Sequence, residues 1–419
     1  MLTKIFILIL FIIMYEILIR KYIIMKKFNF KHTILACFIG YTVQAIVCNF
    51  APLLFVGWEN EFNISMGQLT TLITITFFTQ IVIDLASAKF ADKIGYKKCL
   101  VIAHISSSIG FALLAILPYV MDNSFLALLI PITIYSIGSG LLEVLVSPVV
   151  ESCPTDNKAG YMSLLHSFYC WGTVGTILIS TLYFAFAGRD NWRYLALAWA
   201  VYSLLNGIFF IFVPIIEPKE ESKNQKISTI FKQKFFLIAI VLMVCSGAAE
   251  LAMSQWASAF AETGLNVSKT IGDLAGPMAF AVLMGTGRII FSKLSSKFKI
   301  ENYLFLSSVL CILSYLIACL SPNAVVSLIG CAMCGLSVSA LWPGTISITT
   351  KAMPNASTTV FALLAVAGDI GCTTGPTVIG WISDALGGEL KKGLIFSILF
   401  PILIILALLA NKKQQSKSL

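Results

Sequence analysis

The sequence predicts an all-α integral membrane protein with twelve transmembrane helices in two six-helix, pseudo-symmetric halves. Apolar residues make up 58% of the 419 positions and charged residues only 12%, and the mean hydropathy is +0.90. A membrane-spanning helix needs about 20 mostly apolar residues, and the chain divides into stretches of roughly this length. The longest polar interruption lies near the middle of the chain. No room remains for a large soluble domain.

Twelve apolar stretches follow one another from residue 31 onward, and each ends in a short polar segment that is typical of a helix end. The expected spans are 31–56, 68–88, 99–119, 125–150, 160–186, 193–216, 234–262, 272–293, 302–320, 324–350, 358–383 and 392–410. We interpret residues 217–233 as a linker between an amino-terminal half, 31–216, and a carboxy-terminal half, 234–410, which a tail, 411–419, follows.

An internal repeat supports the division into two halves. A single offset of 200 residues aligns identical residues at five positions, which fall in corresponding loops and helices of the two halves. The aligned pairs are Lys93 and Lys293, Lys97 and Lys297, Pro154 and Pro354, Gly175 and Gly375, and Gly188 and Gly388.

Residues 1–30 do not belong to this set of twelve. Residues 5–19 are apolar apart from Glu16 and could form an extra helix, an interfacial helix, or sequence upstream of a true start at Met25. We favour a start at Met25 or a peripheral helix, because the remaining residues form a complete set of twelve spans.

Lysines are concentrated in alternate loops. They precede the first span, follow the second and the eighth, fill the linker and end the chain, whereas the other loops carry few basic residues. Positively charged loops stay in the cytoplasm, so both termini of the twelve-helix core are predicted to be cytoplasmic in a cell-membrane protein. The formal charge of +9 is therefore explained by topology and membrane lipid, and no nucleic acid is expected as a partner.

Three acidic residues lie well inside apolar spans: Glu143 in the fourth, Glu250 in the seventh and Asp369 in the eleventh. A charged group in a spanning helix costs at least about 2.5–3.5 kcal/mol on insertion scales, so such residues are candidates for function. The alternative is that each acid pairs with a polar neighbour and holds helices together. His166 could be a proton partner of Glu143 or a structural residue, and all four are candidates for proton coupling.

Small and polar residues extend from two of these acids along their helices at steps of three and four, so these faces should not meet lipid. Amide, carboxylate and indole groups together suit a hydroxyl-rich solute, which needs polar partners and a flat apolar face. The candidates for binding the solute are Gln44, Asn49, Glu143, Glu250, Gln255, Trp256 and Trp342, and we expect Trp256 and Trp342 to line a central cavity.

The loop after the second span reads Ala88-Lys-Phe-Ala-Asp-Lys-Ile-Gly-Tyr-Lys-Lys98. Its Asp92, Gly95 and Lys97 resemble the gating signature between helices two and three of the major facilitator superfamily. Gly140-Leu-Leu-Glu-Val-Leu-Val-Ser-Pro148 is similar to helix four of fucose-permease-like sugar:proton symporters, as are the segments 165–168, 342–346 and 380–384. The resemblance covers residues 31–410 and implies the major facilitator fold, with Glu143 as the membrane acid for sugar recognition and proton coupling.

These features predict a secondary transporter that moves a sugar or another small polar solute by alternating access, in symport with protons. A drug or metabolite efflux carrier is the alternative within transport, and a non-transporting membrane sensor or scaffold is the alternative from another class. An enzyme is not expected, because the chain lacks His-Glu-x-x-His, Gly-x-Ser-x-Gly and phosphate-binding glycine motifs.

The expected partners are a small-molecule substrate, protons and membrane lipid, and the protein is expected to act as a monomer. No cofactor and no metal are expected. The spacing Cys331-x-x-Cys334 lies in an apolar helix without a second pair of ligands, and most of the eleven cysteines fall in apolar stretches as reduced residues.

Overall fold

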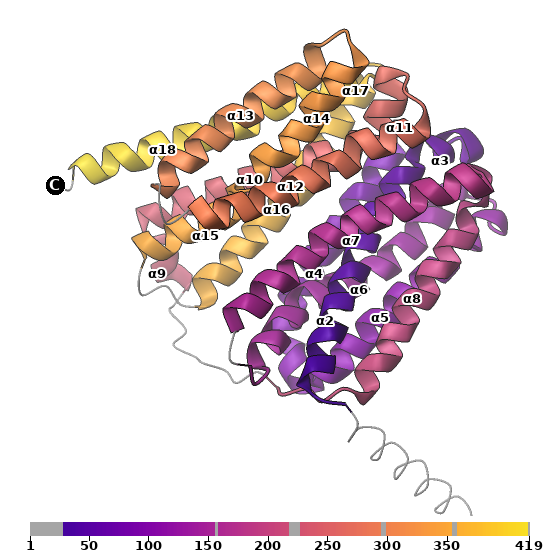
Figure 1. Cartoon of the computed structure of the whole chain (residues 1–419), viewed down its shortest axis with the longest axis horizontal. Coiled ribbons are helices and arrows are strands. Elements are labelled where there is room, and N and C mark those ends of the chain that lie inside the picture. Colours follow the sequence, from indigo (N-terminus) through magenta and orange to yellow (C-terminus); the bar gives the residue numbers. More distant parts are fainter. Residues whose placement is uncertain (1–27, 156–157, 218–226, 295–298, 354–357, 418–419) are drawn as a thin grey trace, which may run out of the picture.

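The computed structural model describes residues 28–155, 158–217, 227–294, 299–353 and 358–417 (Figure 1). Every regular element within these residues is helical, and twelve helices are long and apolar enough to cross a membrane. The prediction of twelve spans is therefore confirmed. The amino-terminal segment that was expected as an extra or interfacial helix, residues 1–24, lies outside the described residues.

The first six spans form the amino-terminal group. The first span begins with α2 (Phe30–Asn49) and continues through a 3₁₀ turn into α3 (Phe55–Phe62), where an Asn63 in the left-handed conformation ends it. The others are α4 (Met66–Ile94), α5 (Tyr96–Leu114), α6 (Ser124–Ser152), α7 (Lys158–Ala187) and α8 (Trp192–Phe212).

The last six spans form the carboxy-terminal group, which the short helix α9 (Ile227–Phe231) precedes. Three of its spans are interrupted by a 3₁₀ or π turn or by a break in the helix, and α10 is followed by a π turn. The spans are α10 (Lys234–Ala259), α11 (Lys269–Asp273) with α12 (Ala279–Leu294), α13 (Ile300–Leu320), α14 (Ala324–Val338) with α15 (Leu341–Ala352), α16 (Thr358–Ala385), and α17 (Leu390–Leu394) with α18 (Leu399–Lys417).

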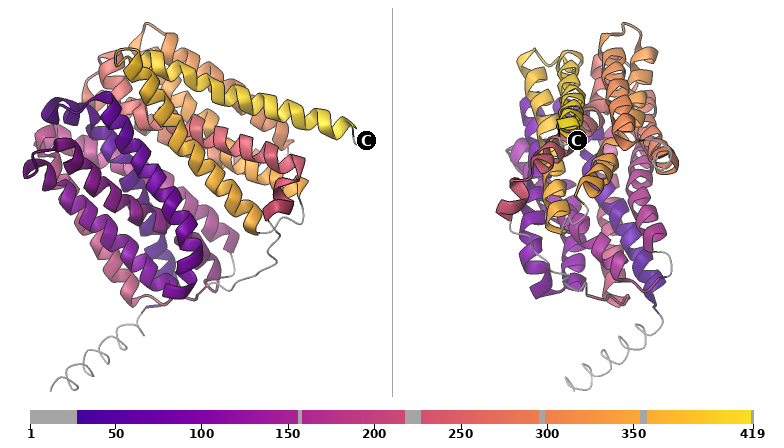
Figure 2. Two further views of the ribbon diagram at one scale, coloured as in Figure 1. Left: turned by 180° about the vertical axis from the view of Figure 1, so that it is seen from behind. Right: turned by 90° about the vertical axis from the view of Figure 1, so that its left-hand side faces the viewer.

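The two groups meet through α4 against α16 and through α7 against α11 and α12. We call the end of the bundle that carries α9 and the turn at Gly95 the linker end, and the end that carries α3, Gly188 and α11 the far end. The groups lie close together at the far end and diverge toward the linker end (Figures 1 and 2).

Two tight turns support the internal repeat. Gly188 follows α7 and Gly388 follows α16, and their φ angles of 85° and 81° lie in the region that favours glycine. The two positions are 200 residues apart and both precede the last span of their group. Corresponding turns of the two groups therefore share a backbone conformation as well as a residue type.

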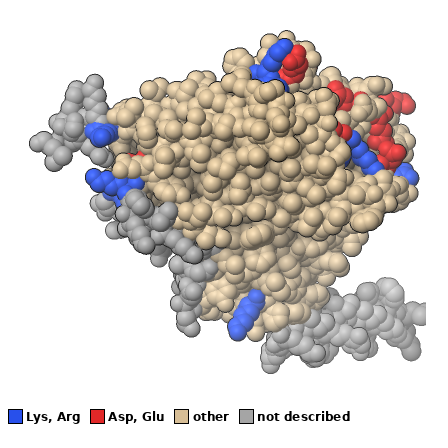
Figure 3. All heavy atoms as spheres, turned by 45° about the horizontal axis from the view of Figure 1, so that its top comes forward, with Lys and Arg blue, Asp and Glu red and all other residues tan. Residues whose placement is uncertain are grey.

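Apolar side chains cover the outside of the bundle. Figure 3 shows a broad surface without charge, and the Lys, Arg, Asp and Glu side chains gather around its rim. Among the large apolar residues exposed on α5, α8, α13 and α18 are Ile109, Leu205, Leu306, Leu313 and Leu406. Such a continuous apolar surface suits lipid rather than water, so the chain is a multi-pass membrane protein.

Candidate functional site

A cavity of about 630 Å³ lies between the two helix groups. Four helices of each group line it: α2, α4, α6 and α7 from the amino-terminal group, and α10, α12, α15 and α16 from the carboxy-terminal group. None of the described residues of α5, α8, α13 and α18 lines the cavity, and these helices carry much of the exposed apolar surface. The fold thus separates lipid-facing helices from cavity-lining helices.

Six of the residues that the sequence suggested for coupling or binding line this cavity. They are Gln44, Glu143, His166, Glu250, Trp342 and Asp369. Each is a polar or aromatic residue on a span that otherwise consists mostly of apolar residues, which is the signal that identified it. The structure brings them together from helices that are far apart in the sequence.

Three other candidates lie elsewhere, because they are engaged in packing between helices. Trp256 is fully buried and donates from its Nε1 to the carbonyl of Pro376 at 3.0 Å, so the expectation that it lines the cavity was wrong. The side-chain amide of Gln255 donates to the carbonyl of Cys48 at 3.2 Å across the two groups. The Asn49 amide donates to the carbonyl of Ala45 and to Thr173 in the amino-terminal group.

Three carboxyl groups meet at the boundary between the two groups. One carboxylate oxygen each of Asp84 on α4, Glu143 on α6 and Asp369 on α16 lie within 4.8 Å of one another. Among the described residues, no Lys, Arg or His forms an ion pair with any of them. The Oδ1 atom of Asp84 is buried and has no hydrogen-bond partner within the described part of the chain. We call these three residues the carboxyl cluster.

Asp84 was not among the candidates from the sequence. It lies in the second apolar stretch, but close to the basic loop that follows, where an acid can reach water. Only the position of α16 shows that Asp84 lies deep between the helices, because Asp369 of α16 lies beside it. The signal that could have found it is the helical spacing of Gln80, Asp84 and Ser87, all of which are buried on one face of α4.

Arg288 is a second functional candidate that sequence reasoning missed. Arg288 falls inside the expected span 272–293, but it was not among the candidates; it lies on α12, which continues to Leu294, and it lines the cavity. Its Nη2 lies 3.6 Å from the Oε1 of Glu250 on α10. The cavity therefore contains a guanidinium group as well as carboxyl groups.

Hydrogen bonds fix several of the lining side chains before any solute binds. The hydroxyls of Tyr41 on α2 and Ser147 on α6 lie 2.8 Å apart. The side-chain amide of Gln80 donates to the Ser139 hydroxyl at 2.6 Å. The amino-terminal wall of the cavity is thus preorganised by contacts among α2, α4 and α6.

The family model of the Major Facilitator Superfamily matches residues 33–376, which is most of the chain. The chain belongs to this superfamily. The family that the sequence motifs indicated is therefore confirmed.

Several proteins resemble the chain over most of its length. The membrane protein MosC of Rhizobium meliloti is 21% identical over 354 residues, which are 83% of this chain and 82% of that protein. A D-xylose-proton symporter is 14% identical with a TM-score of 0.72, covering 90% of this chain and 95% of the symporter. At such identities, likeness to a solved structure shows the fold alone.

Two further solved structures share the superfamily fold. A bacterial homologue of the human lysosomal transporter Spinster, in an inward-facing and occupied conformation, is 15% identical with a TM-score of 0.72 and covers 90% of this chain and 95% of its own. The fucose:proton symporter of E. coli is 16% identical with a TM-score of 0.62 and covers 90% of this chain and 97% of its own.

The loop that resembles the superfamily's gating signature forms the turn between α4 and α5. Gly95 makes this turn with a φ of 93°. The Lys97 ammonium donates to the carbonyl of Val213 at 3.0 Å, and Glu217 accepts from the backbone N–H of Tyr96 at 3.0 Å. The loop is thereby attached to the end of α8. The side chain of Asp92 lies outside the described part of the structure.

Charged residues join the two groups at the far end. The Arg189 guanidinium donates to both carboxylate oxygens of Glu262, at 2.6 and 3.0 Å. Nearby, the buried Asp273 accepts from Thr181 of α7 at 3.3 Å and from Ser258 of α10 at 2.6 Å, and it pairs with Lys269 at 2.8 Å. These contacts hold the far end closed in this conformation.

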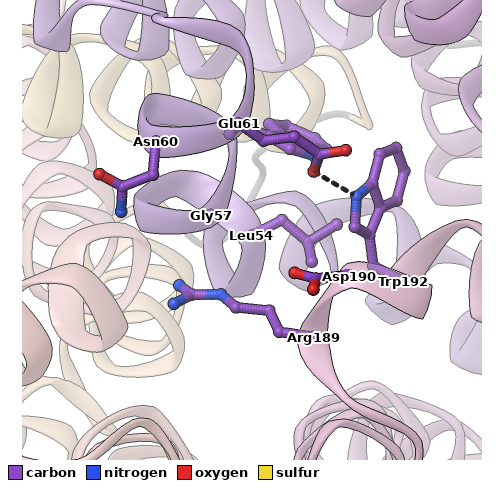
Figure 4. Close-up of a pocket in the computed structure, with 8 residues that line it drawn as sticks. Leu54, Gly57, Asn60, Glu61, Arg189, Asp190 and Trp192 are labelled. Atoms are coloured by element: carbon purple, nitrogen blue, oxygen red, sulfur yellow. Dashed lines mark hydrogen bonds between the residues drawn. The ribbon is translucent and has the colours of Figure 1, made fainter.

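A second hollow, of about 340 Å³, lies beside this ion pair at the far end. Figure 4 shows Asn60, Glu61, Arg189 and Asp190 around it, with Glu61 accepting a hydrogen bond from Trp192 at 3.0 Å. Gly57 leaves room for the arginine, because a Cβ atom there would lie 3.0 Å from its Nε. The hollow therefore belongs to the closed arrangement of the far end.

Proposed function

We propose that this protein is a secondary transporter that moves a sugar or another small polar solute across the cell membrane by alternating access, in symport with protons. The observation that carries this proposal is the central cavity, which both helix groups line with carboxyl, amide and aromatic side chains. Rocking one group against the other would expose this cavity to each side of the membrane in turn.

The composition of the cavity favours a small polar solute. Its volume of about 630 Å³ is in the range of small-molecule sites. Gln44, Glu143 and Asp369 offer hydrogen-bond partners for hydroxyl groups, and Trp342 offers an aromatic ring against which a sugar ring can pack. The xylose and fucose symporters that share the fold support a sugar as the solute.

The carboxyl cluster favours protons as the coupling ion. Three carboxyl groups within 4.8 Å of one another, without a basic partner among the described residues, cannot all carry charge in a water-poor site. Protons would neutralise them while α4 and α16 remain together. Because Asp84 and Asp369 belong to different groups, separation of the groups would change the proton affinity of the cluster and so couple protonation to movement.

We place the linker end in the cytoplasm, because lysines are concentrated in the loops of that end and in the linker. Under this orientation, the ion pair of Arg189 with Glu262 closes the extracellular side, and the structure is an inward-facing state. Transport requires that these far-end contacts open during each cycle.

The test uses the full chain in proteoliposomes with an imposed proton gradient and a panel of radiolabelled sugars. Wild type should accumulate its solute, and collapse of the gradient should reduce uptake to equilibration. Glu143→Gln and Asp84→Asn should lose accumulation, whereas Asp122→Asn, in an exposed loop, should keep it.

Three outcomes of this test contradict the proposal. Uptake that does not depend on the proton gradient would exclude proton coupling. Uptake that depends on a sodium gradient would identify sodium as the coupling ion in place of the proton. Accumulation by Glu143→Gln at the wild-type level would remove Glu143 from the coupling site.

A further inference from the structure

Arg288 lies in the membrane-spanning part of the protein with few good hydrogen-bond acceptors around it. Its Nη1 donates to the sulfur of Cys170 at 3.3 Å, and its Nη2 donates to the sulfur of Met284 at 3.9 Å. Its Nε is buried without a partner among the described residues. Sulfur is a weak acceptor, so the hydrogen bonds of this guanidinium are poorly satisfied by the protein.

The ion pair with Glu250 does not supply a strong hydrogen-bond acceptor for Arg288. The separation of 3.6 Å between Arg288 Nη2 and Glu250 Oε1 is too long for a hydrogen bond. A guanidinium group usually binds a carboxylate with two parallel hydrogen bonds, as Arg189 does with Glu262 at the far end. Among the described residues, Arg288 therefore has no oxygen acceptor within hydrogen-bond distance of its guanidinium.

Although its Nε is buried, the Arg288 side chain as a whole is accessible from the cavity. The side chain of Arg288 is 31% exposed, and the residue lines the cavity together with His166 and Tyr169 of α7. A charged arginine is costly in a spanning helix unless it is paired or serves a ligand. The weak sulfur acceptors of Nη1 and Nη2 and the exposure of the side chain together indicate a ligand with oxygen acceptors.

The charges of the cavity are unevenly distributed. The carboxyl cluster is built from α4, α6 and α16, whereas Arg288 extends from α12 toward α7 and α10. No ion pair joins Arg288 to the cluster among the described residues. A solute between them would meet hydroxyl-binding carboxyl groups on one wall and a guanidinium on another.

We propose that Arg288 binds an anionic oxygen group of the solute, and that the preferred substrates are sugar acids, which carry a carboxylate beside several hydroxyl groups. This inference rests on the proposed function and narrows its substrate class. A guanidinium binds a carboxylate through two charge-assisted hydrogen bonds, whereas a neutral hydroxyl can use only part of this geometry. Symport of an anion with a proton also moves less net charge than symport of a neutral sugar.

The experiment compares three solutes that differ in one substituent: galactose, galacturonate and galactosamine. Binding to the purified full-length protein is measured by the rise in melting temperature, because a ligand of the native state stabilises it by mass action. Galacturonate should bind at least about tenfold more tightly than galactose, and galactosamine more weakly than either. In Arg288→Gln this preference for the acid should disappear, while binding of galactose remains.

Two control variants separate ligand binding from a structural role. Arg193→Gln removes an arginine that packs on Tyr119 and Tyr194 near the far end, and it should keep the preference for galacturonate. Glu250→Gln removes the one acidic residue that pairs with Arg288 among the described residues; it lines the cavity and can change overall affinity, but the ratio of galacturonate to galactose affinity should be kept or increased. If Glu250→Gln instead abolished the preference for galacturonate, as Arg288→Gln is expected to do, Arg288 would serve to pair with Glu250 and not to bind the solute.

The outcomes distinguish this inference from the proposed function. Tighter binding of galactose or galactosamine than of galacturonate would overturn the inference and leave a polar-solute transporter in place. An acid preference that survives in Arg288→Gln would also overturn it. If neither these three solutes nor a wider panel of sugars raised the melting temperature, the proposed function itself would fail.

Discussion

Gly368 gives the Trp342 side chain its position beside the cavity. A Cβ atom at residue 368 would overlap the six-membered ring of Trp342, which lines the cavity from α15. Glycine is therefore required at this point of α16 by close packing rather than by backbone conformation. The contact sets how far the indole extends toward the solute.

Gly368→Ala should displace the Trp342 ring into the cavity and weaken solute binding about tenfold, or about 1.4 kcal/mol, which is in the range for overpacking. A melting-temperature titration with the identified solute measures this. The control is Gly175→Ala on α7, where the added Cβ meets no atom within 4 Å. Unchanged affinity in Gly368→Ala would show that Trp342 does not contact the solute.

Single residues also show where sequence reasoning succeeds. Glu143 and Asp369 were identified because each interrupts an apolar stretch, and this signal depends only on the cost of charge in a membrane. Trp256 was assigned wrongly because an indole suits both a cavity and a packed interface, and the neighbours in space decide between them. For Trp256 these neighbours are Phe55 and Pro376, which no local pattern predicts.

At the scale of elements, the ion pair of Arg189 and Glu262 joins a 3₁₀ turn before α8 to a π turn after α10. It has two hydrogen bonds, and its side chains are 25% and 18% exposed. Removal of such a pair should cost about 1–2 kcal/mol after allowance for solvent screening, which shifts the balance of two states by about five- to thirty-fold.

Glu262→Gln should therefore open the far end more often. Cys372 reports this, because it lines the cavity and is the one cysteine of the chain that is not buried. A membrane-impermeant thiol reagent applied at the far end should label Cys372 faster in Glu262→Gln than in wild type. Glu389→Gln is the control, since its partner Lys392 lies in the same helix group. Equal labelling rates in all three proteins would exclude a gating role for the pair.

The sequence predicted the number of spans correctly, but it predicted their ends and internal turns less well. The expected first span ended at residue 56, whereas the helix continues through a 3₁₀ turn to Phe62. Apolar stretches reveal that a helix crosses the membrane, but polar residues such as Glu59 and Glu61 end the apolar pattern before the helix ends. The far-end helix α11 and the π turns are likewise invisible to hydropathy, because they change the backbone without changing the composition.

For the whole molecule, the twelve spans and the two groups follow from hydropathy and the internal repeat. Which helices line the cavity was only partly predictable. Polar or aromatic residues on spans one, four, seven and ten indicated that these spans surround a central cavity. The contributions of α4 and α12 required the packing of both groups, which brings together residues as distant in sequence as Asp84 and Asp369. Long-range pairing of this kind leaves no periodic signal in one sequence.

Alternating access makes a prediction about the molecule as a whole, because the far end must separate in every cycle. The hydroxyls of Thr74 on α4 and Thr377 on α16 lie 2.7 Å apart across the two groups. Cysteines at both positions would therefore be within reach of a disulfide. Oxidation of the double variant Thr74→Cys, Thr377→Cys should stop transport, and a reducing agent should restore it.

The same double variant separates binding from transport. With the far end fixed, solute should still reach the cavity from the linker end and raise the melting temperature, although no flux occurs. Each single cysteine variant, oxidised in the same way, should transport normally and so exclude effects of the native cysteines. Normal flux through a protein whose cross-link is verified by intact mass would mean that the solute does not pass between α4 and α16, and rocking of the two groups would not be its mechanism.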